Sequence, residues 1–136
     1  MLLLYAVVKF VAYSGWCYLG LSLIYPGAAR VTFAMKLGAL RWLLGLLFGI
    51  AAFMFMGSIS SDAVAKTYVL LYTPLRAIEW TIMVIFIWRT TRVERLVPSY
   101  RLVALWIAGG MLLSFVTDLA SPEGLSGKFC VGRCLC

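Results

Sequence analysis

Apolar residues occupy four long runs of this chain, and short polar segments separate them. The runs cover residues 2–24, 37–57, 68–88 and 102–119. Each run is about as long as an α-helix must be to cross the hydrocarbon core of a bilayer, roughly 20 residues. The pattern therefore predicts an all-α fold, an integral membrane bundle of four transmembrane helices.

The segments between the runs carry the residues that end or start helices. Pro26 and Gly27 follow the first run, residues 58–67 are polar, and residues 89–101 form the most basic loop. A cleaved signal peptide suits the first run poorly, because the run has no basic start and contains Lys9. We expect a single membrane domain over residues 1–136, with a short tail at 123–136.

Composition agrees with a membrane location. The 136 residues are 64% hydrophobic and 12% charged, and the mean hydropathy is +1.01. Soluble domains are nearer half apolar and a quarter charged, so this chain has too few polar residues to cover a water-soluble surface. The net charge of +7 is concentrated in loops, which favours contact with the lipid bilayer and its anionic headgroups over nucleic acid.

The charges of the loops predict an orientation. The first loop with its flank holds Arg30, Lys36 and Arg41, and the third loop adds four arginines, against three basic residues at the other side. Basic loops stay in the cytoplasm. We therefore expect both termini on the non-cytoplasmic side, in a bacterial inner (plasma) membrane.

The third run carries charge near its middle. Arg76 and Glu79 lie three residues apart, so on a helix they share a face and can pair. Charged groups at membrane depth are costly and often functional. Two interpretations stay open: a neutralised pair that fixes helix packing, or an ion or proton site lined by Glu79.

Two further charged residues extend this membrane polar site. Lys9, in the first run, either reaches towards Glu79 or extends outwards to the interface. Asp118, near the end of the fourth run, is placed to balance part of the positive charge. If the positive groups converge, their excess suits an anion better than a cation.

Pro74 lies two residues before Arg76. A proline inside a helix removes one backbone hydrogen bond, so we predict that the third helix is kinked there. Broken helices with charges beside the break are common at transporter sites, although structural helices also contain prolines.

Glycines mark candidate helix-packing positions. Gly45 and Gly49 form a small-xxx-small spacing in the second run, and Gly109 and Gly110 are adjacent in the fourth. Small residues let helices approach closely in membranes.

The tail carries Cys130, Cys134 and Cys136. On the non-cytoplasmic side, a structural disulfide is one interpretation. A soft-metal site, redox exchange and inert thiols are the others. Cys17, within the first run, reads as a small apolar residue. The chain has no histidine, which excludes sites that need an imidazole, and we expect neither a cofactor nor a bound metal.

Three functions remain open. The leading expectation is a non-enzymatic membrane subunit that self-associates into a homo-oligomer or anchors a larger membrane complex. Copies packed together could bury the polar seam, the charged residues that lie within the apolar runs. The alternatives are a small transporter or channel using Arg76 and Glu79, and a thiol- or metal-handling protein using the tail.

Overall fold

The computed structural model describes residues 2–25, 29–56, 64–91 and 99–119. This part of the chain forms four α-helices: α1 (Leu2–Ile24), α2 (Val31–Met56), α3 (Val64–Thr91) and α4 (Tyr100–Leu119). The predicted all-helical fold is therefore confirmed.

Three of the four helices, α1, α2 and α4, are long and apolar enough to cross a membrane. Their candidate spans are Leu4–Ile24, Val31–Ala51 and Tyr100–Leu119. The third helix, α3, contains the charged pair and continues through Pro74. Its membrane crossing and its kink stay predictions.

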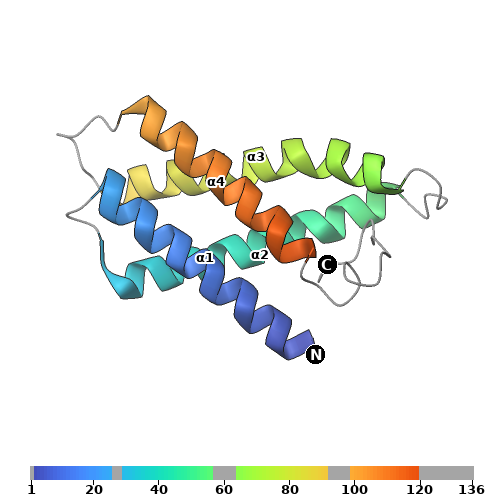
Figure 1. The fold of residues 1–136 in the computed structure, drawn as a ribbon, viewed down its shortest axis with the longest axis horizontal. Coiled ribbons are helices and arrows are strands. Elements are labelled where there is room, and N and C mark those ends of the chain that lie inside the picture. The colour runs from blue at the N-terminus through green and yellow to red at the C-terminus, as the bar shows by residue number, and fades with distance from the viewer. Residues whose placement is uncertain (1, 26–28, 57–63, 92–98, 120–136) are drawn as a thin grey trace.

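Consecutive helices run in opposite directions. In Figure 1 the end of α1, the start of α2, the end of α3 and the start of α4 lie at the same side of the bundle, on the left. The helix ends on either side of the first and third connections therefore lie at one end of the bundle.

The second helix begins earlier than the sequence predicted. α2 starts at Val31 rather than Leu37, so Lys36 belongs to the helix and Arg41 lies ten residues into it. The side chain of Arg41, which the sequence analysis counted with the flank of the first loop, is fully buried in the bundle and is not a loop charge. The loop-charge comparison becomes six basic residues against three.

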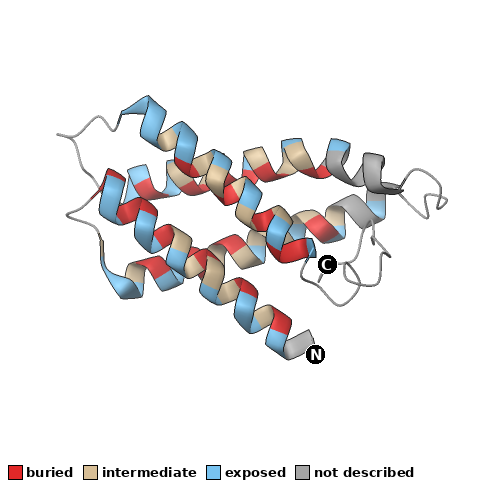
Figure 2. Cartoon of the chain, in the orientation of Figure 1, coloured by how far each residue is buried: buried red, intermediate tan, exposed pale blue. Residues whose placement is uncertain are grey.

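The core is built around aromatic and branched side chains from all four helices. Tyr13, Leu37, Trp80, Met83 and Trp106 are buried in it, and Figure 2 shows buried and exposed residues alternating along each helix. The outer surface is apolar as well, with Leu4, Leu47 and Leu105 each more than half exposed. An apolar exterior is what contact with lipid requires.

Two glycines allow close contact between neighbouring helices. At Gly38 a side chain would collide with Ser14, whose backbone nitrogen would lie only 2.9 Å from the added carbon. α1 and α2 therefore pack closely at this point. At Gly110 a side chain would collide with the buried indole of Trp80, so the predicted close approach at Gly110 joins α4 to α3.

Candidate functional site

Five charged side chains meet inside the bundle, and every helix contributes at least one. They are Lys9 of α1, Arg41 of α2, Arg76 and Glu79 of α3, and Asp118 of α4, here called the ion-pair network. All five residues are buried, with exposed fractions between 0% for Arg41 and 8% for Lys9.

Each carboxylate of the network is shared between two cations. Oε2 of Glu79 lies 2.6 Å from Nη2 of Arg41 and 3.3 Å from Nη1 of Arg76. Oδ2 of Asp118 lies 2.6 Å from Nη2 of Arg76, and Oδ1 lies 2.5 Å from Nζ of Lys9. Positive and negative groups therefore alternate from Lys9 to Arg41, with three cations and two carboxylates.

Neutral groups support both ends of the network. At one end the Tyr5 hydroxyl accepts from Lys9 Nζ at 2.9 Å and donates to Asp118 Oδ1 at 3.3 Å. At the other end Ser114 Oγ accepts from Arg41 Nη2 at 3.2 Å. Ser114 itself donates to the carbonyl oxygen of Gly110 at 2.9 Å, which fixes its position on α4.

Aromatic rings cover the cationic groups. Cζ of Arg41 lies 5.0 Å from the ring centre of Tyr13 and 5.4 Å from that of Trp80. The same carbon of Arg76 lies 5.6 Å from the ring centre of Tyr72. Cation–π contacts of this kind partly replace the water that a buried guanidinium loses.

The structure brings together all the charged residues that the sequence singled out. Arg76 and Glu79 pair within α3, as their spacing predicted. Lys9 is buried and bonded to Asp118, so its side chain turns inwards, towards Asp118 rather than Glu79. Asp118 pairs with both Lys9 and Arg76 and so joins α1 to α3.

Sequence reasoning missed Arg41 and Ser114. The predicted second span began at Leu37, which placed Arg41 beside the interface. With α2 starting at Val31, Arg41 lies roughly 15 Å inside the helix, at 1.5 Å per residue. The apolar character of residues 31–35 was the available signal that the helix starts before Leu37.

The predicted packing glycines have different surroundings. At Gly45 an added carbon would lie 3.2 Å from Nη1 of Arg41 and 3.7 Å from Nη1 of Arg76, so this glycine borders the ion-pair network. Gly49 is buried. Gly109 lies under the ring of Trp16, where a side chain would collide, so it joins α4 to α1.

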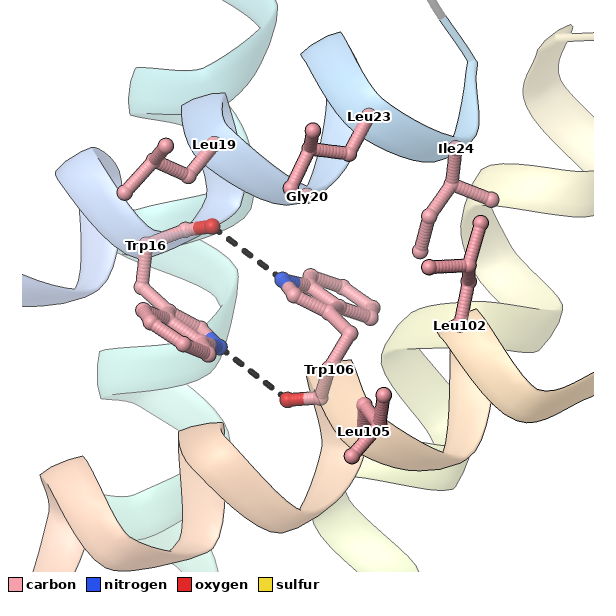
Figure 3. Close-up of a pocket in the computed structure, with 8 residues that line it drawn as sticks. All are labelled: Trp16, Leu19, Gly20, Leu23, Ile24, Leu102, Leu105 and Trp106. Atoms are coloured by element: carbon pink, nitrogen blue, oxygen red, sulfur yellow. Dashed lines mark hydrogen bonds between the residues drawn. The ribbon is translucent and has the colours of Figure 1, made fainter.

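A reciprocal contact joins α1 to α4 away from the charges. Nε1 of Trp16 donates to the carbonyl oxygen of Trp106 at 3.1 Å, and Nε1 of Trp106 donates to that of Trp16 at 3.1 Å (Figure 3). Each ring lies over a glycine of the opposite helix, Gly109 and Gly20 respectively. Beside this contact is an apolar pocket of about 220 Å³, lined by leucines of both helices.

The predictions for the cysteine tail lie outside the described residues, and these include Cys130, Cys134 and Cys136. Cys17 is fully buried, as expected of a small apolar residue. Within the four described helices, no group of three or more histidine, cysteine or acidic side chains is arranged to hold a metal ion.

The arrangement allows partner exchange. Because each carboxylate holds two cations, neutralising or displacing one carboxylate would release positive groups that an anion can bind.

Comparison with known protein families, with curated proteins and with solved structures finds no match to this chain.

Proposed function

We propose that this chain is an integral membrane protein with four spanning helices, α3 included, and that it is a small, non-enzymatic transporter or channel for anions. The ion-pair network is its site. The length and apolar character of α1, α2 and α4 support the membrane location. The bias of six basic residues against three supports non-cytoplasmic termini in a bacterial inner membrane.

The excess of positive charge in the network carries this proposal. An excess of buried positive charge favours an anion as a further partner, because a charge without a counter-charge is costly to bury. Here, counted over the described residues, Lys9, Arg41 and Arg76 face two carboxylates within the buried interior. An uncompensated charge there costs several kcal/mol, as an order of magnitude, and an anion would offset that cost.

The position of the ion-pair network within the bundle also suits passage of an anion. Asp118 is the penultimate residue of α4, whereas Glu79 and Arg41 lie well inside α3 and α2. The network therefore joins the end of α4 to the interior of α2 and α3. Pro74 has no N–H to donate to the carbonyl oxygen of Leu70, so α3 has one backbone hydrogen bond fewer just before Arg76.

Reconstituted liposomes provide the test. With a chloride gradient and a potassium ionophore that dissipates the potential, we expect chloride flux above that of empty vesicles. In vesicles without the ionophore, the protein should not carry potassium. Lys9→Met and Arg76→Gln should reduce the flux, whereas Arg101→Gln, which changes an exposed arginine outside the network, should not. Absence of protein-dependent anion flux would refute the proposal.

The role of a self-associating or anchoring subunit is the competing proposal. That expectation rested on the charged residues of the spans being buried most easily between copies of the chain. Arg41 and Glu79 are already buried within a single chain, so the seam lends it no support. The mass of the detergent-solubilised particle, corrected for bound detergent, decides whether the protein is an oligomer.

A further inference from the structure

We propose that the edge of Arg41 that faces Gly45 binds a small, weakly hydrated monovalent anion, such as chloride, bromide or thiocyanate. This inference deepens the proposed anion transport and names the site and class of the anion. It starts from the hydrogen-bonding groups of Arg41.

The guanidinium of Arg41 is only partly satisfied by the described residues. Nη2 contacts Glu79 and Ser114, but Nε and Nη1 have no hydrogen-bond partner among them. The residue is fully buried, so bulk water does not reach these donors. Buried donors on a charged group are costly when they are left without an acceptor.

Geometry restricts where an acceptor can approach. The rings of Tyr13 and Trp80 lie near the guanidinium, and Nη2 is occupied by Glu79. The Nη1 edge borders Gly45, where α2 presents no side chain. The position of the missing Cβ lies within 4 Å of Nη1 of both Arg41 and Arg76, so both guanidinium groups border the space beside this glycine.

A second donor lies close by. The hydroxyl of Tyr13 is buried and has no hydrogen-bond partner among the described residues. Its ring centre is 5.0 Å from Cζ of Arg41. The core around Arg41 therefore holds a second buried donor that has no acceptor among the described residues.

Charge and surroundings define the class of anion. Among the described residues, the network carries one more positive than negative group, so a single monovalent anion would balance their charge. The neighbouring core includes the fully buried Cys17, Leu37 and Met83, which offer no polar groups to replace a tightly held hydration shell. Sulfate and fluoride lose their water at greater cost, and gluconate is too large for a buried site.

The test measures binding separately from flux. Purified protein in sodium gluconate is titrated with chloride, bromide or thiocyanate at constant ionic strength, and the unfolding temperature is followed. We expect a saturable rise with these anions and none with sulfate. In Gly45→Ala the new methyl covers Nη1 of Arg41, so the apparent Kd should increase about tenfold or more.

Two more variants complete the design. Gly15→Ala is the matched control, because a side chain at Gly15 meets nothing within 4 Å, and it should bind as the parent does. Arg41→Lys keeps the charge but removes the Nε and Nη1 donors, so it should lose the saturable response even if Gly45→Ala folds poorly.

Each outcome separates the two proposals. If binding is saturable and both Gly45→Ala and Arg41→Lys weaken it, but the protein carries no anion flux, the site is supported and the transport function is refuted. Anion flux that both variants leave unchanged supports transport and refutes the site. An unfolding temperature that does not depend on the kind of anion also refutes the site.

Discussion

Arg41 Nη2 lies 2.6 Å from Oε2 of Glu79 and 3.2 Å from Oγ of Ser114, so one nitrogen joins α2 to both α3 and α4. The local pair between Arg76 and Glu79 is longer, at 3.3 Å, and Arg76 has Asp118 as a second partner. The principal partner of Glu79 is therefore Arg41, which changes what mutations should do.

We expect Glu79→Gln to lower the free energy of unfolding by about 3–5 kcal/mol, because it leaves Arg41 without its carboxylate in a buried position. In double-mutant cycles, the coupling of Glu79→Gln with Arg41→Met should exceed its coupling with Arg76→Met. Chemical unfolding of the purified protein in detergent micelles measures both cycles. Equal couplings, or a Glu79→Gln variant as stable as the parent, would contradict this arrangement.

Asp118→Asn should destabilise the protein more than Lys9→Met. The first change removes the charge that holds both Lys9 and Arg76, whereas after the second Asp118 still pairs with Arg76. Combining the two changes should recover part of the stability lost in Asp118→Asn, because one stranded cation is then gone. Arg101→Gln, on the exposed surface, serves as the control and should stay within about 0.5 kcal/mol of the parent. Additive losses in the double variant would count against the shared carboxylate.

Gly20→Ala and Gly109→Ala should each cost about 1–3 kcal/mol, because the added methyl collides with the ring of Trp106 or Trp16. Both changes should also alter the near-ultraviolet circular dichroism, since they move an indole that is hydrogen-bonded across α1 and α4. Gly15→Ala has open space and should leave the spectrum unchanged. Unaltered spectra in all three variants would show that the reciprocal tryptophan contact does not form.

The orientation can be tested with single cysteines in a variant that lacks the native ones. Given the bias of six basic residues against three, an impermeant maleimide should label a cysteine at position 63 in intact cells but not one at position 90. Labelling at position 90 alone would invert the proposed topology.

For the tail, we expect Cys130 and Cys134 to be oxidised when free thiols are blocked at lysis, because disulfides persist on the non-cytoplasmic side. Non-reducing electrophoresis should additionally reveal whether Cys136 links two chains. Three free thiols, or a stoichiometric bound metal that requires them, would replace the disulfide interpretation.

The sequence by itself determined the helical character of the chain and the pairing of Arg76 with Glu79. Long apolar runs can satisfy their backbone hydrogen bonds inside a membrane as helices, so run length alone predicts the elements. A spacing of three residues places two side chains on one helix face, so that pair needs no tertiary information. The apolar run did not fix the start of α2 at Val31, because residues 31–36 mix apolar side chains with a basic one beside a proline-containing loop.

Only the tertiary structure decided that Arg41 is the main partner of Glu79 and that Asp118 joins Lys9 to Arg76. Contacts between helices depend on how far each helix is rotated about its axis and shifted along it. In α1 and α2 apolar residues lie on every face, so their periodicity does not specify which face turns inwards. Glycines at 20, 38 and 109, each beneath a side chain of another helix, set those rotations through close packing that no single helix contains.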